Sequence, residues 1–339
     1  MTKIMNNIKD FFLRFKNASA ETRYKMVLKG TSAFAVVLRY LVLIAIGYIV
    51  LYPLFYMISS SIRTGDSFYD PSIVWITSDV TLENFKLAAK LMHYQEALIN
   101  TVVHELIAAV IQIISCAFVA YGLARFEFKE KKILIGFMFM LIIVPSQMMM
   151  LPIVNTYKQL DVVGILGLIN NWTGVDLRPN ILGGIWTFYL PAFFGVGIRA
   201  GIIIYIYVQF FKGLPKELEE AAWIDGAGPL RTFLRIALPS SGVVIMTVTV
   251  FSIIWHWNDY YLSAMYLYAE KWPLAVRLGD LANDDVLKTI GIQSYGAEFP
   301  QSIAIVMAGC LMFVVPVLIM YMILQKNFVK SIDRVGITG

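Results

Sequence analysis

Charged side chains are scarce in this chain of 339 residues. Asp, Glu, Lys and Arg make up 15% of it, hydrophobic residues make up 58%, and the mean hydropathy is +0.69. A soluble globular domain has about 25% charged and about 45–50% apolar residues. The shortage of charge therefore excludes a soluble enzyme or binding domain and predicts a membrane protein that crosses the bilayer several times.

Cysteine and histidine are also rare. The two cysteines, Cys116 and Cys310, lie inside apolar runs, where a free thiol packs as a small hydrophobic residue, and two cysteines build no disulfide framework. The three histidines, His93, His104 and His256, are scattered, and none has a second ligand at metal-binding spacing. We therefore predict structural roles for all five and no metal site.

The chain lacks the run Gly-x-x-x-x-Gly-Lys-Ser/Thr, which cradles the phosphates of ATP in P-loop proteins. No cluster of nucleophile, base and acid stands out either. We therefore predict that the chain is not an enzyme, has no cofactor of its own and binds no nucleic acid.

Long apolar runs are what the sequence has in abundance. Each run of about 20 residues can cross a bilayer, and must do so as a helix because no water reaches the backbone there. In the fourth run, Pro191 separates an outer lead-in that starts at Ile181 from the span proper. The sequence predicts an all-α integral membrane protein with six transmembrane helices, at 34–61, 98–124, 133–154, 192–211, 242–262 and 302–324.

Lysine and arginine are distributed unevenly between the loops. With the N-terminus inside, the inner segments hold 18 of these residues and the outer loops hold 8, and basic residues favour the cytoplasmic side. We expect both termini in the cytoplasm: an arm at 1–32, too long and polar for the start of a cleaved signal peptide, a membrane domain at 33–325 and a tail at 326–339.

The loop at 213–240, between the fourth and fifth spans, is polar and contains several residues that typically start or end a helix. Pro215 suits the first position of a helix, and the glutamates that follow favour the positive end of the helix dipole. Gly226 suits a left-handed helix end, and Pro229 opens a second helix that runs to Pro239. The pattern predicts a helix, a turn and a helix at the cytoplasmic surface.

The first helix of this loop has one smooth face. Leu218, Ala221, Ala222 and Asp225 recur at i, i+3, i+4 and i+7. This face is compatible with an interfacial amphipathic helix that lies under its own bundle. It is equally compatible with a docking helix that fits a groove on a cytoplasmic partner.

The same loop resembles the EAA loop of ATP-binding-cassette (ABC) importer permeases. The resemblance rests on Glu220-Ala221-Ala222, on Gly226 six residues after that glutamate, and on Ile236-x-Leu238-Pro239. The longer form LPKELEEAAxIDGA is similar to the carbohydrate branch, the maltose-permease-like subunits. Further similar segments are VAYGLARFEFKEKK at 119–132, VPSQMMMLPI at 144–153, WND at 257–259 and the tail QKNFVKSIDRVGITG.

The resemblance covers the chain from about residue 83 onward, with two departures. One is the stretch GVGIRAGIIIYIYVQFF before the loop, and the other is the outer segment after the fifth span. Both departures leave the identity of the sugar open.

The resemblance implies a permease subunit that imports a sugar or oligosaccharide. Its partners would be a cytoplasmic ABC ATPase dimer, which holds ATP and Mg, a second related permease and an extracytoplasmic solute-binding protein. The EAA helix would be the coupling helix that fits a groove on the ATPase. Glu220 and Asp225 would contact the groove rim, Ala221 and Ala222 would permit close approach, and Gly226 would turn the chain. Leu218 and Pro239 belong to the same coupling motif.

Ionisable residues inside membrane spans are candidates for the substrate path. Glu105 lies in the second span, within reach of its outer side. Arg199 precedes Lys212 by 13 residues, which is about 20 Å along a helix and too far for its side chain to reach the cytoplasm. We expect it to face the bundle interior, paired with an acid or lining a wet cavity.

Polar and aromatic residues cluster at the outer end of the fifth span, where Trp257, Asn258, Asp259 and Tyr260 follow one another. They form either an aromatic belt at the lipid interface or a sugar path. Three other functions stay open: an ABC permease for an amino acid or polyamine, an ion-driven secondary transporter, and a membrane enzyme. The lack of visible repeats argues against the secondary transporter.

Overall fold

The computed structural model describes residues 20–70, 75, 79–161, 163–292 and 299–336. Within these ranges every element is helical, apart from one antiparallel bridge between Arg63 and Val80. The chain divides into two compact units, residues 1–59 and 60–339. Most of the expected arm at 1–32 lies outside the described residues.

The first unit contributes most of helix α2 (Ala20–Ser61). Its apolar part, Ala35–Ser61, is long enough to cross a membrane, which agrees with the first predicted span. Large apolar side chains such as Val37, Leu41 and Ile49 are exposed along this part. Such a helix, apolar and unburied, suits a lipid environment.

Two helices of the second unit are also long and apolar enough to cross a membrane. One runs without interruption over Tyr94–Arg125, and the other covers Phe299–Gln325, in agreement with the second and sixth predicted spans. The first comprises α4 (Tyr94–Asn100), the π-helical segment η2 (Thr101–Leu106) and α5 (Ile107–Arg125); the second is part of α18 (Phe299–Gly336).

The third predicted span, 133–154, is wrong as one continuous helix. The chain forms α6 (Lys131–Ile143) and α7 (Ser146–Lys158), which meet at 107°. Pro145 lies at the junction and Val144 before it is extended. Proline has no N–H for the helix and disfavours helical backbone in the residue before it, so the apolar run folds as a bent pair.

The fourth apolar run is also divided. Helix α9 (Trp186–Phe193) ends well before α10 (Ala200–Gly213) begins, so the predicted span at 192–211 is interrupted. Helix α10 has 14 residues and is about 21 Å long, which is less than the roughly 30 Å of a hydrocarbon core.

The fifth predicted span, 242–262, corresponds to α14 (Gly242–Trp257), which ends before the predicted boundary. The helical stretch Pro229–Ser240 meets it at 80°. The described residues thus contain three helices able to span a membrane, or up to five if each bent pair is one span.

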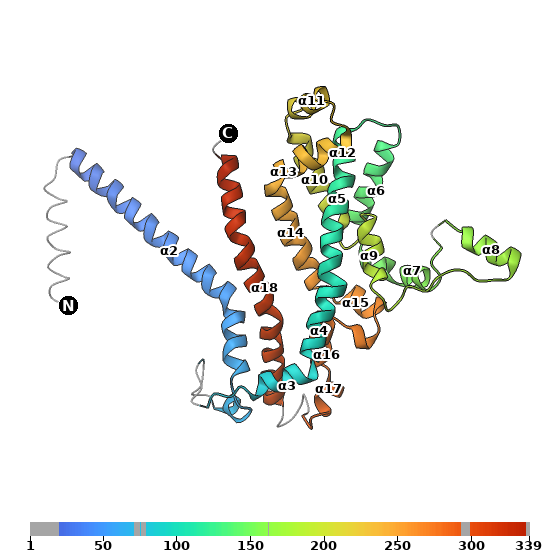
Figure 1. Ribbon diagram of the computed structural model, residues 1–339. Helices are drawn as coiled ribbons and strands as arrows, with labels where there is room; N and C mark the ends of the chain where they lie inside the picture. Colours follow the sequence, from blue (N-terminus) through green and yellow to red (C-terminus); the bar gives the residue numbers. More distant parts are fainter. Residues whose placement is uncertain (1–19, 71–74, 76–78, 162, 293–298, 337–339) are drawn as a thin grey trace, which may run out of the picture. The chain divides into compact units, whose positions relative to one another are not determined.

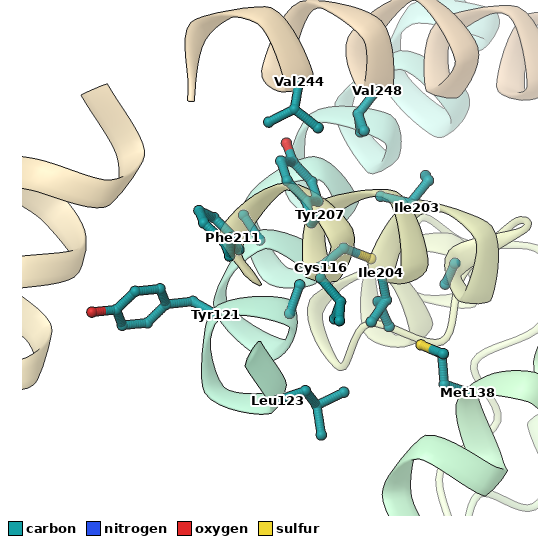
Figure 2. Close-up of a cluster of buried hydrophobic side chains, with 14 of the residues drawn as sticks. Cys116, Tyr121, Leu123, Met138, Ile203, Ile204, Tyr207, Phe211, Val244 and Val248 are labelled. Atoms are coloured by element: carbon teal, nitrogen blue, oxygen red, sulfur yellow. The ribbon is translucent and has the colours of Figure 1, made fainter. Parts of the chain in front are cut away.

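The main core lies where α5, α10 and α14 meet (Figure 2). Cys116 of α5 and Tyr207 and Phe211 of α10 are completely buried there, against Val244 and Val248 of α14. Cys116 thus has the packing role predicted for it. In a bilayer such packing, rather than escape from water, holds helices together.

Shorter helices lie at both ends of α5 (Figure 1). Those near Arg125 are α11 (Glu217–Ile224), α12 (Pro229–Thr232), the π-helical segment η3 (Phe233–Ala237) and α13 (Leu238–Ser240). Those near the opposite end include α3 (Glu83–Leu91), α15 (Tyr261–Tyr266), α16 (Leu274–Leu281) and α17 (Asp284–Lys288). Helices α3 and α16 pack on α18. The remaining elements are η1 (Asp66–Tyr69), α8 (Ile165–Thr173) and η4 (Ala269–Lys271).

Candidate functional site

Helix α11 ends where the sequence predicts. Gly226 has φ +78°, its N–H donates to the Trp223 carbonyl at 3.0 Å, and the Ala227 N–H donates to the Ala222 carbonyl at 2.9 Å. These two bonds form a Schellman motif, which needs a left-handed residue at its turn. A Cβ on Gly226 would meet nothing within 4 Å, so backbone conformation alone requires the glycine.

The other boundaries of this loop are close to the predicted ones. Helix α11 begins at Glu217, two residues after Pro215, and Pro229 opens α12. The helical path then continues past Pro239 to Ser240. Its π-helical part, η3, was not predicted.

The two sides of α11 differ in exposure. Leu218 is 47% exposed, and Glu220, Ala221 and Asp225 are exposed as well. Ala222, which shares the i, i+3, i+4 and i+7 pattern with Leu218, Ala221 and Asp225, is buried. It lies with Glu219 on the side that packs against the bundle, because only part of a two-turn helix can face outward.

Glu219 makes a buried ion pair at this end of the bundle. Its Oε1 accepts from Arg125 Nε at 2.9 Å, and both side chains are almost completely buried. Arg125 Nη2 also donates to the Leu214 carbonyl at 2.8 Å. Arg125, the last residue of α5, therefore fixes the loop at two points, one before α11 and one within it.

The outward side of the loop is apolar and bordered by basic residues. We name as the loop surface the five exposed side chains Leu218, Trp223, Ile224, Leu230 and Leu234. An open hollow of about 490 Å³ adjoins it and is lined by Gly228, Pro229, Leu230, Arg231, Leu234 and Arg235. Exposed apolar patches with a polar border mark sites of contact with other molecules.

Charged residues of both signs occur in this region of the chain. Lys131 Nζ donates to Glu127 Oε1 at 2.8 Å, and this bond lowers the pKa of the Glu127 carboxyl below its ordinary value. Lys212 and Lys216 lower it further through their charge. Helix α11 itself carries the exposed acidic side chains Glu217, Glu220 and Asp225, so a partner surface there meets both signs of charge.

A second candidate site lies toward the other end of α5. Glu105, in the π-helical segment η2, is completely buried. Its Oε1 accepts from Ser263 Oγ at 2.6 Å, and the same hydroxyl lies 2.9 Å from Asp259 Oδ2. Glu105 and Asp259 were predicted as two separate candidates. The structure brings them together through Ser263, which was not predicted.

This cluster has more acceptors than donors. Ser263 has one hydroxyl proton to share between two carboxylate oxygens, and Glu105 Oε2 has no hydrogen-bond partner. The Ser263 N–H donates to Asp259 Oδ2 at 2.8 Å, so it provides no donor for Glu105 Oε2. The arrangement can hold a proton or accept a hydrogen bond from a hydroxyl group of a ligand.

Arg199 lies at the break between α9 and α10. It has left-handed backbone, with φ 52°, and caps the start of α10. Its guanidinium lies 5.2 Å from the ring of Trp255, a cation–π distance. The side chain is exposed in the single chain and forms no ion pair with any residue that the structure describes. Of the two expected surroundings, an acid partner is thus absent among these residues, and a wet cavity stays a prediction.

Two side chains of α5 support this break. Gln112 Nε2 donates to the Ile198 carbonyl at 2.7 Å, and Ser115 Oγ donates to the Ala192 carbonyl at 2.5 Å. Backbone groups freed by a helix break inside a membrane need such partners. Neither residue was predicted: the sequence shows two polar residues at i and i+3 in an apolar run, but not which carbonyls they meet.

The three remaining nominated residues differ in exposure and in their partners. Trp257 is buried, and its Nε1 donates to the Phe313 carbonyl at 3.2 Å, so in this chain it packs α14 on α18. Asn258 is exposed and bonds back to the Ile254 carbonyl at 2.8 Å. Tyr260 is 42% exposed.

No group of three or more His, Cys, Asp or Glu side chains is placed to hold a metal ion in the described part of the chain. The histidines lie in different surroundings. His104 and His256 are buried, and His256 Nδ1 is 2.8 Å from the Ser252 carbonyl of its own helix.

Comparison with known proteins identifies the family. Residues 112–334 match the model of the "binding-protein-dependent transport system inner membrane component". A probable ABC transporter permease protein of Bacillus subtilis, YurM, is 26% identical over 94% of this chain and 91% of its own length. The trehalose transport system permease protein SugB of Mycobacterium tuberculosis is 27% identical over 87% of this chain and 95% of its own.

A solved structure has the same fold. It is a chain of a bacterial ABC transporter involved in the import of the acidic polysaccharide alginate. The TM-score is 0.63 with 21% sequence identity, over 88% of this chain and 98% of the other. Taken together, the family match, the apolar helices and the shared fold show that this multi-pass membrane chain belongs to the inner membrane components of binding-protein-dependent transport systems.

Proposed function

We propose that this chain is one of two transmembrane subunits of an ABC importer for a sugar or oligosaccharide. An extracytoplasmic binding protein delivers the sugar, and a separate ATPase dimer holds ATP and Mg. The EAA sequence at 220–222 and the match to an ABC permease support the importer. The similarity to a trehalose permease supports a carbohydrate as substrate.

The proposed arrangement in the membrane has six spans and both termini in the cytoplasm. The two bent helix pairs and the divided α9–α10 run supply the spans that are not continuous helices. The loop at 213–240 then lies in the cytoplasm. The excess of Lys and Arg in the segments on that side supports this orientation.

The loop surface carries the functional proposal. Leu218, Trp223 and Ile224 of α11 are 47%, 45% and 87% exposed, on a short helix whose other side is fixed to the bundle. Large apolar side chains in water are costly unless a partner covers them. We infer that α11 is the coupling helix, with Glu220 and Asp225 at the rim of the ATPase groove and Ala221 beside its floor.

The transport cycle follows from this placement. ATP binding closes the ATPase dimer, draws the coupling helices of the two permeases together and opens the outer side to the binding protein. Hydrolysis resets the transporter. The tail at 326–339 is a further contact with the ATPase.

The proposed substrate path uses two places in this chain. At the break before α10, Arg199 and Trp255 offer a cation and an aromatic face. Toward the outer side, Glu105 and Asp259 offer carboxylate oxygens to sugar hydroxyls, and Asn258 and Tyr260 are exposed nearby in sequence. Trp257 supports the path through packing, because its ring is buried against Phe313.

The coupling proposal is tested with Leu218→Asp. A charge in the middle of the loop surface opposes burial in the groove, so we expect the ATPase to be lost when the tagged permease is purified from native membranes. Leu168→Asp is the matched control, because Leu168 of α8 is 61% exposed. Retention of the ATPase by Leu218→Asp would contradict the assignment of α11.

The substrate proposal is tested by transport into proteoliposomes that contain the whole complex and its binding protein. Labelled mono- and oligosaccharides are compared with amino acids and polyamines. ATP-dependent uptake of a sugar is expected. Uptake of a non-sugar solute alone, or ion-driven uptake by the purified chain, would transfer the assignment to the corresponding alternative.

A further inference from the structure

The ion pair between Arg125 and Glu219 joins the loop to the continuous helix Tyr94–Arg125. Their side chains are 5% and 6% exposed, and the Nε–Oε1 distance is 2.9 Å. Neither residue belongs to the loop surface. The pair therefore faces the bundle, where its effect is on the position of α11 relative to α5.

Aromatic contacts hold the other arm of the loop to the same helix end. The ring of Phe233, in the π-helical segment η3, lies 4.5 Å from that of Phe118 and 5.0 Å from that of Tyr121. Tyr121 also contacts Phe211 at the end of α10, at 5.5 Å (Figure 2). Both sides of α11 are thus attached to the last two turns of α5.

The far part of the same helix reaches two places where backbone is irregular. Glu105 precedes Arg125 by 20 residues, which is about 30 Å along a helix, and it bonds to Ser263 beyond α14. Between them, Gln112 and Ser115 hold the carbonyls of the α9–α10 break. One continuous helix therefore contacts the loop, the break before α10 and the outer turn after α14.

We propose that Arg125 and Glu219 are positioning residues that make α11 move together with α5. A displacement of α11 by the ATPase then reaches the α9–α10 break and the outer turn through α5. The inference rests on the proposed function, in which α11 is the coupling helix. It adds the intramolecular connection that carries the displacement into the membrane.

The positioning role can be tested because changing one partner of a buried ion pair has a different effect from changing both. Removing one partner leaves an uncompensated buried charge, whereas reversing both keeps the pair, and replacing both by apolar residues is often neutral for stability. The variants are Arg125→Gln, Glu219→Gln, the exchange R125E/E219R and the apolar pair R125L/E219L. The matched control is Glu127→Gln, because the Glu127 side chain is 87% exposed and its ion pair in the described part of the chain is with Lys131 of the nearby loop.

The measurement is sugar transported per ATP hydrolysed by the reconstituted complex, together with the amount of ATPase that co-purifies. Each single variant is expected to keep the ATPase and its hydrolysis but to lower the ratio roughly tenfold, the size of a coupling energy between contacting residues. The exchange is expected to restore most of the ratio. The apolar pair is expected to stay uncoupled, and the control to match the unmodified complex.

Three results would overturn the inference. The first is a normal ratio in the single variants. The second, if these fail to assemble, is a normal ratio in the apolar pair, which would show that the ion pair serves folding alone. The third is an exchange variant that assembles stably and stays uncoupled. Failure of the proposed function is distinguishable, since no ATPase would then co-purify with the unmodified chain.

Discussion

Three glycines of the second unit differ in their backbone φ and in the space that a Cβ atom would have. Gly226 has φ +78° and open space around a would-be Cβ. Gly183 has φ +72°, and a Cβ there would lie 2.1 Å from Tyr268. Gly213, the last residue of α10, has neither constraint. Alanine substitutions at these positions therefore separate backbone strain from steric overlap.

We expect Gly226→Ala to lower the free energy of unfolding by about 1–2 kcal/mol, the cost of left-handed backbone with a Cβ. Gly183→Ala adds the overlap with Tyr268 and is expected to cost more. Gly213→Ala is expected to be neutral or slightly stabilising, since alanine favours helix. Thermal unfolding of the purified protein in detergent measures all three, and an equal effect at Gly226 and Gly213 would contradict the strain argument.

Local residue choices were predictable, whereas distant partners were not. The turn at Gly226 and the helix start at Pro229 depend on backbone preferences of single residues, so the sequence contains their signal. The partner of Glu219 lies 94 positions earlier in the chain. No spacing rule within a helix connects such residues, and only the packing of α5 against the loop reveals the pair.

Among the elements, breaks were harder to predict than spans. Long apolar runs predicted α2, Tyr94–Arg125 and α18 because hydropathy alone determines a continuous span. Apolar residues lie on both sides of Val144-Pro145 and of 194–199, where the helices bend or stop. Pro145 was a usable signal. The second break depends on Gln112 and Ser115, whose roles appear only when α5 and α9 are packed together.

The supports of that second break lead to an element-scale prediction. Gln112→Leu removes the donor to the Ile198 carbonyl and leaves it unpaired inside the bundle, which costs about 1–3 kcal/mol. The melting temperature in detergent is expected to fall by roughly 2–8 °C. Gln147→Leu, the same change at an exposed position of α7, is expected to leave it unchanged. A drop of equal size in both variants would show that the lost bond is not the cause.

At the scale of the whole molecule, the irregular elements and the continuous ones have complementary roles. The continuous helix ending at Arg125 contacts both the loop at one end and the carboxylate cluster near the other. Helices α9, α10 and α14 pack against it, whereas α6 packs on α10 and α7 on α15. The bent pairs and the α9–α10 break supply backbone able to change direction. A rigid element next to irregular ones suits a transport subunit, because motion is carried by the first and taken up by the second.

The proposed six-span arrangement requires the loop at 213–240 and helix α8 to lie on opposite sides of the membrane. Single cysteines report the side, provided that Cys116 and Cys310 are first replaced by alanine. Intact cells are used, and an outer membrane, if the cell has one, is permeabilised first. Asn171→Cys in α8 is then expected to react with a membrane-impermeant maleimide. Lys129→Cys and Gly228→Cys are expected to react only after the cytoplasmic membrane is opened. All three positions are exposed, so access to the reagent decides the result.

The opposite pattern would reverse the orientation, and it would place the loop surface outside the cell, where no ATPase could reach it. Labelling of Asn171→Cys and Gly228→Cys from the same side would instead remove one crossing between them. Apart from α11, the helices that the structure describes between these positions are α9 and α10. Helix α10 has just 14 residues, which is short for a span of its own. That result would make α10 a helix that enters the membrane and returns, and the six-span arrangement would have to be replaced by one with α9 and α10 on a re-entrant path.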